Sequence, residues 1–212
     1  MSREKPITHS RLRNIHEQVL SDDWFLLKKT SFDFLRRDGG WQGQSRETYD
    51  RGNGAVLLPY NRARQTVLLT RQFRFPTVVN GNADGMLIEA CAGLLDGDDP
   101  ASCIRRETEE ELGLRIRAPR KVFEAYMSPG SVTEKLYFFV AEYDADDRIS
   151  TGGGQVAEGE DIEVIECQLS DAQAMIEQGR IQDGKTIMLL QWLQLSRLCE
   201  ACASAGEQDH KA

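Results

Sequence analysis

The segment from Asp98 to Leu114 constrains the fold of this chain more than any other, because it predicts a helix with sharply defined ends. Asp99 followed by Pro100 is typical of a helix start, and Gly113 is typical of a helix end. One stripe of the predicted helix can pack inward, and it consists of Ile104, Thr108 and Leu112.

Beside that stripe, the same helix carries three crowded carboxylates. At about 100° per residue, Glu107, Glu110 and Glu111 fall within roughly a third of the helix circumference. Like charges at these spacings repel one another, so an isolated helix gains nothing from them. One interpretation is a solvated acidic face. The other is a binding face for hard divalent cations, which prefer oxygen ligands.

The flanking residues favour the metal-binding interpretation, because together they resemble the signature of the Nudix hydrolase superfamily. That signature is Gly, five residues, Glu, seven residues, and then Arg-Glu-U-x-Glu-Glu-x-Gly-U, where U is apolar. The chain matches it at Arg106-Glu107, Glu110-Glu111, Gly113 and Leu114. It departs from it at Ala92, Asp98 and Thr108, and Gly93 lies one position late. The carboxylates that bind metal in this family are all present.

Composition limits the possible partners. With 34 acidic and 26 basic residues among 212, the chain is a poor candidate for non-specific nucleic-acid binding. No apolar run is long enough to span a membrane, and the N-terminal residues lack a signal-peptide core, so we expect a cytoplasmic protein. Five cysteines without a dense pattern suggest reduced thiols, and the pair Cys199 and Cys202 is interpreted as incidental.

The order of predicted elements indicates an α/β fold. Residues 10–60 read as antiparallel strands, and further strands are expected at 66–75, 86–95, 121–130, 135–144 and 161–169. Residues 144–161 read as a mobile acidic loop with little to pack. Helices are expected at 171–179 and, capped by Asp183, at 186–203. Layers of helix, sheet and helix follow from this order.

This organisation agrees with the Nudix fold, in which a mixed β-sheet is sandwiched between helices. We expect three parts: an N-terminal antiparallel β extension at 1–50, a Nudix domain at 51–203 and a flexible tail at 204–212. In the ADP-ribose and nucleotide-sugar hydrolases of the superfamily, such an extension forms a small sheet that helps to build a dimer. The resemblance therefore implies a homodimer.

Within the superfamily, the chain resembles the GDP-mannose hydrolase branch over nearly its full length. That branch shows the same Ala and Asp departures from the signature. Its other characteristic segments appear here as YDRGNGA (49–55), RQFR (71–74), VNGN (79–82), LIEACAGLLD (87–96), MSPGSVTE (127–134), EDIEV (160–164) and DGKT (183–186).

The resemblance implies a metal site and a substrate site. Metal ligands would be the Ala92 carbonyl, Glu107, Glu111 and Glu160, with Mg²⁺ as the cofactor and Mn²⁺ as a possible substitute. Glu160 lies on the acidic loop, where it is either the catalytic base or a metal ligand only. Contacts to the nucleotide sugar would come from Trp24, Ser45, Arg46, Glu47, Arg74, Ala92, Gly93, Leu94, Glu134, Gly159, Glu160 and Lys185.

Several of these assignments have a physical rationale and an alternative. Trp24 could stack on guanine, or it could be a core or interface aromatic. Arg74 and Lys185 can contact phosphate oxygens, with Lys185 at a helix start, or they can be solvated surface cations. Arg46 and Glu47 lie in the N-terminal extension, which suggests a site that reaches across a dimer.

The expected function is magnesium-dependent hydrolysis of GDP-mannose to GMP and mannose 1-phosphate. Metal ions would lower the pKa of a bound water and stabilise the charge that develops on the pyrophosphate. One alternative is a pyrophosphatase for ADP-ribose or another nucleotide sugar. An alternative of another class is a nucleotide-binding regulator without turnover, which the intact carboxylates disfavour.

Overall fold

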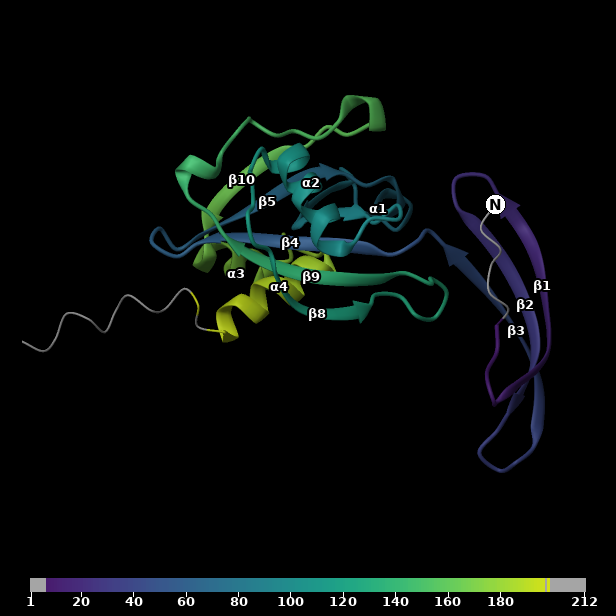
Figure 1. Cartoon of the computed structure of the whole chain (residues 1–212). Helices are drawn as coiled ribbons and strands as arrows, with labels where there is room; N and C mark the ends of the chain where they lie inside the picture. The colour runs from purple at the N-terminus through teal and green to yellow at the C-terminus, as the bar shows by residue number, and fades with distance from the viewer. Residues whose placement is uncertain (1–6, 197, 199–212) are drawn as a thin grey trace, which may run out of the picture. The chain divides into compact units, whose positions relative to one another are not determined.

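The computed structural model describes residues 7–196 and 198, and these fall into two compact units (Figure 1). The smaller unit combines the N-terminal residues up to Asn53 with Tyr126–Lys135. The larger unit contains Gly54–Ala125 and the described residues from Leu136 onward. In the described part of the chain, every helix is too short or too polar to cross a membrane.

The smaller unit is built on an antiparallel sheet of β1 (Leu12–Asp22), β2 (Leu26–Leu35) and β3 (Trp41–Asp50). The β2–β3 turn contains Gly39 with a φ of +82°, a conformation that favours glycine. Most residues of β1 and β3 are exposed. Because a sheet is normally stabilised by burying at least one face, this unit gains little from a core of its own.

A second chain segment is hydrogen-bonded to this sheet. The amide of Tyr49 donates to the Ser131 carbonyl at 2.8 Å, and the amide of Thr133 donates to the Tyr49 carbonyl at 3.2 Å. The Thr133 hydroxyl also donates to Asp50 at 2.7 Å. These contacts explain why residues 126–135 group with the N-terminal strands.

The larger unit contains seven strands and four α-helices among the described residues. Its strands are β4 (Gly54–Asn61), β5 (Thr66–Phe73), β6 (Met86–Glu89), β7 (Cys91–Leu94), β8 (Arg120–Tyr126), β9 (Lys135–Glu142) and β10 (Glu163–Gln168). Its α-helices are α1 (Phe75–Val79), α2 (Pro100–Leu112), α3 (Leu169–Glu177) and α4 (Gly184–Leu195). Two short 3₁₀ helices, η1 (Ala145–Asp147) and η2 (Val156–Glu158), lie between β9 and β10.

The strands of the larger unit form one mixed sheet in the order β10-β5-β4-β9-β8, and β6 and β7 pair with β5 and β4. Strand β4 runs parallel to β9 and antiparallel to β5 and β7, and all of its residues are buried. Helix α2 lies on one face of the sheet, and α3 and α4 lie on the other (Figure 1). The expected α/β sandwich with an antiparallel β extension is confirmed.

The core beneath α2 follows from alternation in the strands. Ala55 and Leu57 of β4 point to one face of the sheet, where they pack with Ile104 and Leu112 of α2. All four side chains are fully buried. The apolar stripe predicted for the helix therefore faces the sheet, and this fixes the direction of the neighbouring carboxylates.

Several sequence-based boundaries are wrong, and one of them is the strand expected at 121–130, which ends at Tyr126. The single strand expected at 86–95 is two strands, because the Ala90 amide leaves the ladder and donates to the Thr186 hydroxyl at 2.7 Å. The strand expected at 66–75 ends at Phe73, and the unpredicted α1 follows it. Helix α4 begins at Gly184 and ends at Leu195. Cys199, Cys202 and the tail at 204–212 lie outside the described residues.

Candidate active site

Helix α2 has the ends that the sequence predicts. The Asp99 side chain accepts hydrogen bonds from the amides of Ala101 and Ser102, at 3.0 and 3.1 Å, and so caps the helix start. Gly113 follows the last helical residue with a φ of +67°. These caps fix where the helix begins and ends, and therefore where its carboxylates lie along the sheet.

Glu107 and Glu111 are buried rather than solvated. Glu107 is 9% exposed and Glu111 is 2% exposed, while one oxygen of Glu111, Oε2, is buried without a hydrogen-bond partner. The interpretation of this helix as a solvated acidic face is therefore wrong for these two residues. A buried carboxylate oxygen without a partner is costly for the fold, which makes it a candidate ligand for a cation.

Burial also changes the acidity of both groups. Desolvation, together with the charges of Glu110 and Glu160, raises the pKa of Glu107 to about 7, although Arg106 opposes the shift. Desolvation and the charges of Glu107 and Glu160 raise the pKa of Glu111 to about 8. Both carboxyls thus lie in a place where added negative charge is unfavourable and a cation would be favourable.

The backbone of β7 passes directly under the Glu107 carboxylate. A Cβ atom built on Gly93 would overlap the Glu107 side chain, so only glycine leaves room for this carboxylate. On the other side, Arg106 Nη1 lies 2.9 Å from Glu107 Oε1 and 3.3 Å from Glu110 Oε2. Gly93 and Arg106 together hold the carboxylate of Glu107 against the strand that contains Ala92.

Thr108, where the family signature has an apolar residue, is accommodated by two local hydrogen bonds. Its hydroxyl donates to the Ile104 carbonyl one turn earlier at 2.5 Å, and the Cys91 thiol lies 3.8 Å from its oxygen. Thr108 is fully buried. Because both of its neighbours satisfy the hydroxyl, the departure from the signature leaves the position of the helix unchanged.

The acidic segment after η1 is tied to the C-terminal end of α2. The amides of Gly153 and Gly154 donate to the carbonyls of Glu111 and Glu110, at 2.9 and 3.1 Å. We expected this segment to have little to pack against. Instead it satisfies helix carbonyls that lack partners within the helix itself.

Glu160 reaches the same neighbourhood through this segment. Its Oε2 accepts a hydrogen bond from the Gln155 amide at 2.9 Å, and Gly154 leaves space for its carboxylate. Its charge contributes to the raised pKa values of Glu107 and Glu111. Gly159, just before it, ends η2 with a φ of +77°. The larger unit thus brings Glu107, Glu111 and Glu160 into electrostatic contact.

The donors fit a hard divalent cation in their chemistry. They are carboxylate oxygens, one of them buried without a partner, and their mutual repulsion would be relieved by positive charge. Within the described residues, however, no three acidic, histidine or cysteine side chains converge closely enough, as they stand, to form a metal site. Binding therefore requires side-chain adjustment around Glu107 and Glu111.

Sequence reasoning missed the residue that organises the two predicted phosphate-binding cations. Glu89, 3% exposed at the end of β6, accepts hydrogen bonds from Arg74 Nε at 2.7 Å and from Lys185 Nζ. Lys185 also donates to Asp183 at 3.0 Å. Arg74 and Lys185 are therefore paired groups rather than simply solvated cations. A single acid within the apolar segment LIEACAG was the available signal.

The remaining predicted substrate residues belong to the smaller unit. Trp24 is 85% exposed, which excludes the alternative of a core aromatic. Arg46 lies on β3 between Ser45 and Glu47, and its side chain faces away from theirs because consecutive strand residues alternate. Glu134 forms an ion pair with Arg51 at 3.4 Å.

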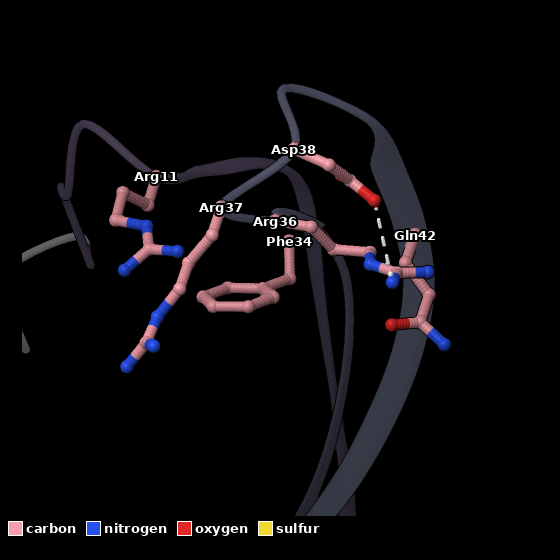
Figure 2. Close-up of a pocket in the computed structure, with 6 residues that line it drawn as sticks. All are labelled: Arg11, Phe34, Arg36, Arg37, Asp38 and Gln42. Atoms are coloured by element: carbon pink, nitrogen blue, oxygen red, sulfur yellow. Dashed lines mark ion pairs between the residues drawn. The ribbon is translucent and has the colours of Figure 1, made fainter.

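A basic hollow of about 720 Å³ also lies in the smaller unit (Figure 2). Its lining consists of Arg11, Phe34, Arg36, Arg37, Asp38 and Gln42, none of which was predicted as a site residue. The Arg11 guanidinium lies over the Phe34 ring, and Arg36 pairs with Asp38 at 3.3 Å. The hollow lacks the clustered carboxylates of the larger unit, so it is not a candidate for the same chemistry.

Two protein-family models match this chain, and their matches meet near residue 50. A model of the NUDIX domain matches residues 50–190, and a model of the GDP-mannose pyrophosphatase NudK N-terminal domain matches residues 11–49.

Curated relatives and a solved structure extend the match. A GDP-mannose pyrophosphatase of Pectobacterium atrosepticum is 59% identical over 177 residues, covering 84% of this chain and 91% of that protein. One from Yersinia enterocolitica is 55% identical over 188 residues, covering 89% and 97%. The crystal structure of an ADP compounds hydrolase shares the fold, with a TM-score of 0.65 at 16% identity over 90% of this chain and 98% of that one. This chain therefore belongs to the Nudix hydrolase family.

Proposed function

We propose that this protein hydrolyses the pyrophosphate bond of GDP-mannose, giving GMP and mannose 1-phosphate. The observation that carries the proposal is the pair of buried carboxylates, Glu107 and Glu111, beside the strand that contains Ala92. The substrate assignment is supported by relatives of this name at 55–59% identity over most of the chain.

Nudix hydrolases generally need a divalent metal, and we propose Mg²⁺, with Mn²⁺ as a possible substitute. Glu107, Glu111, Glu160 and the Ala92 carbonyl would hold it. Bound there, it would acidify a water and offset the charge on the pyrophosphate oxygens. Glu111 offers an oxygen that no protein group uses, and Gly93 keeps Glu107 close to the Ala92 backbone.

Glu160 is the proposed group that receives a proton from the attacking water, or else it serves as a ligand only. Its Oε2 accepts a hydrogen bond from the Gln155 amide, which fixes the direction of the carboxylate. Closure of this segment over the substrate would complete the metal site, with its hydrogen bonds to the end of α2 as the fixed point.

The residues proposed to bind the nucleotide sugar are found in both units. Arg74 and Lys185 would meet phosphate oxygens, with the Ala92, Gly93 and Leu94 backbone and Gly159 beside them. Trp24, Ser45, Arg46, Glu47 and Glu134 would contact the rest of the substrate. The exposed Trp24 ring is available to stack on guanine. We further propose that the protein is a homodimer whose N-terminal sheets contribute to the sites.

The direct test is incubation with GDP-mannose and Mg²⁺ and measurement of GMP. We expect Glu111→Gln to lower kcat by roughly a hundredfold or more, because the group would lose its charge at the metal. Glu109→Gln is the matched control, since Glu109 lies on the same helix and forms an ion pair with Arg115, away from the buried pair. It should remain active.

Each outcome has a distinct meaning. Rapid cleavage of ADP-ribose without cleavage of GDP-mannose would contradict the assignment of GDP-mannose as the substrate. It would leave the assignment as a pyrophosphate hydrolase unchanged. Full activity of Glu111→Gln would contradict the role of the buried carboxylates. A panel with Mg²⁺, Mn²⁺ and Ca²⁺ identifies the cation that supports turnover.

A further inference from the structure

Glu89 lies at the centre of a buried polar network that links three elements of the larger unit. Arg74 directly follows β5 and precedes α1, Glu89 is the last residue of β6, and Lys185 lies in the first turn of α4. Both cations donate to the Glu89 carboxylate, one to each oxygen. A single side chain thus determines the spacing of two charged groups that lie far apart in the sequence.

The network continues into the backbone next to the candidate active site. Asp183 accepts from Lys185 Nζ with one oxygen and from the amide and hydroxyl of Thr186 with the other, at 3.0 and 2.6 Å. The Thr186 hydroxyl in turn accepts from the Ala90 amide at 2.7 Å. Ala90 directly precedes the strand that contains Ala92 and Gly93, so the network reaches the start of that strand.

Because Glu89 is buried, its charge must be balanced by hydrogen-bonded cations. Glu89 is 3% exposed, and a carboxylate without partners at such a position would be strongly destabilising. Burial alone would raise the pKa of Glu89, but the charges and hydrogen bonds of Lys185 and Arg74 outweigh it and lower the pKa. Glu89 is therefore ionised at neutral pH, and its charge holds both cations in place.

We propose that Glu89 is a positioning residue for substrate binding, which orients Arg74 and Lys185 so that they meet the phosphates together. The proposal rests on the proposed function, in which these two cations contact the pyrophosphate. The side chain of Arg74 is 41% exposed, so its remaining guanidinium nitrogens are accessible while Nε is fixed by Glu89. The Lys185 side chain is only 14% exposed. Its direction therefore depends on its two carboxylate partners, Glu89 and Asp183, more than that of Arg74 depends on Glu89.

The test compares Glu89→Gln with the wild-type chain, using whichever nucleotide sugar the wild-type protein cleaves. Glutamine keeps the shape but removes the charge, so Arg74 should lose its ion pair and Lys185 should keep only Asp183 as a charged partner. We expect KM to rise roughly tenfold or more, with a smaller change in kcat, because the metal carboxylates are not altered. Glu89→Asp, which keeps the charge on a shorter side chain, should recover part of the loss.

A double-mutant cycle separates positioning from a merely structural role. If Glu89 acts through Arg74, then Glu89→Gln should raise KM much less in an Arg74→Ala background than in the wild-type chain. The same holds for a Lys185→Ala background. The proposal would be wrong if the fold-increase in KM of the double variant equalled the product of the fold-increases of the two single variants. It would also be wrong if a folded Glu89→Gln protein had an unchanged KM.

A control variant shows whether loss of any acid–arginine pair changes KM. Glu166→Gln is the control variant, because Glu166 also pairs with an arginine, Arg64 at 2.9 Å, and accepts from Tyr143, yet belongs to no proposed site. Its KM should not change. If Glu89→Gln fails to fold, the double-mutant cycle uses Glu89→Asp in its place, and KM is compared in the wild-type, Arg74→Ala and Lys185→Ala backgrounds. Failure of the wild-type chain to cleave GDP-mannose would instead count against the substrate assignment.

Discussion

Glu111 shows how much of this site depends on one residue. Its side chain is buried, its Oε2 lacks a hydrogen-bond partner, and burial together with neighbouring carboxylates raises its pKa to about 8. Without a cation, the group is largely protonated at neutral pH. A divalent ion must therefore displace a proton before it binds this oxygen.

This coupling predicts how metal and pH act on stability. Because the folded-state pKa of Glu111 is raised above its unfolded value, its contribution to stability is complete at low pH and is lost as pH rises through about 8. Glu107 behaves likewise around pH 7. We expect Mg²⁺ to raise Tm more at pH 8.5 than at pH 6, measured by differential scanning calorimetry.

The Glu111→Gln and Glu109→Gln variants also test this coupling between Mg²⁺ binding and pH. In Glu111→Gln, the Mg²⁺-induced rise in Tm should become smaller and less dependent on pH. In Glu109→Gln, both should match the wild-type chain, because Glu109 lies outside the buried pair. An equal Mg²⁺ effect at pH 6 and pH 8.5 in the wild-type chain would show that proton displacement is not part of binding.

At the scale of elements, the decisive contact joins α2 to the segment that carries Glu160. Gly152 approaches the helix end so closely that a Cβ atom would overlap the Glu111 carbonyl, and its φ is +69°. Only glycine satisfies both conditions. The junction therefore aligns the acidic segment with the same turn of helix that carries Glu111.

Gly152→Ala should detach this segment from α2. We expect a destabilisation of about 1–3 kcal/mol from backbone strain and overlap, together with a clear fall in kcat as Glu160 loses its position. Urea unfolding and steady-state kinetics measure the two effects. Gly39→Ala is the control, since Gly39 has a similar φ of +82° with open space around it. It should show strain with unchanged kcat, and an equal loss of kcat in both variants would refute the junction's role.

The elements that the sequence predicted well are those with local signals. Helix α2 was defined by Asp99, Pro100 and Gly113, which act on their nearest neighbours, and the structure confirms both ends. The break between β6 and β7 was not predictable in this way. It depends on the Thr186 hydroxyl, almost a hundred residues further along the chain, which takes the Ala90 amide out of the ladder.

The same distinction applies to the candidate site. Glu107 and Glu111 follow from a short pattern on one helix, and their burial agrees with it. Glu89 carries no pattern of its own, because its importance comes from Arg74 and Lys185, which reach it from before and after it in the chain. Pairings that the tertiary fold creates leave little trace in a single sequence beyond an acid among apolar neighbours.

At the scale of the whole molecule, the chain divides its proposed site residues between two units. Glu107, Glu111, Glu160, Arg74 and Lys185 lie in the larger unit, while Trp24, Arg46 and Glu134 lie in the smaller one. Strands β1 and β3 of the smaller unit expose most of their residues, which leaves this sheet free to contact a second copy of the chain. A homodimer of about 48 kDa, twice the 23.9 kDa of one chain, should be found by light scattering.

A dimer in which each N-terminal sheet serves its partner's site would permit complementation between inactive variants. Glu111→Gln damages the larger unit only, and Arg46→Ala damages the smaller unit only. When the two are allowed to exchange subunits at equal concentration, half of the dimers are mixed, and each mixed dimer contains one intact site. Activity should therefore recover to about a quarter of the wild-type value. Glu111→Gln exchanged with Glu107→Gln should stay inactive, because both changes lie in the larger unit. If the first mixture also stays inactive although mixed dimers form, each site is completed within one chain.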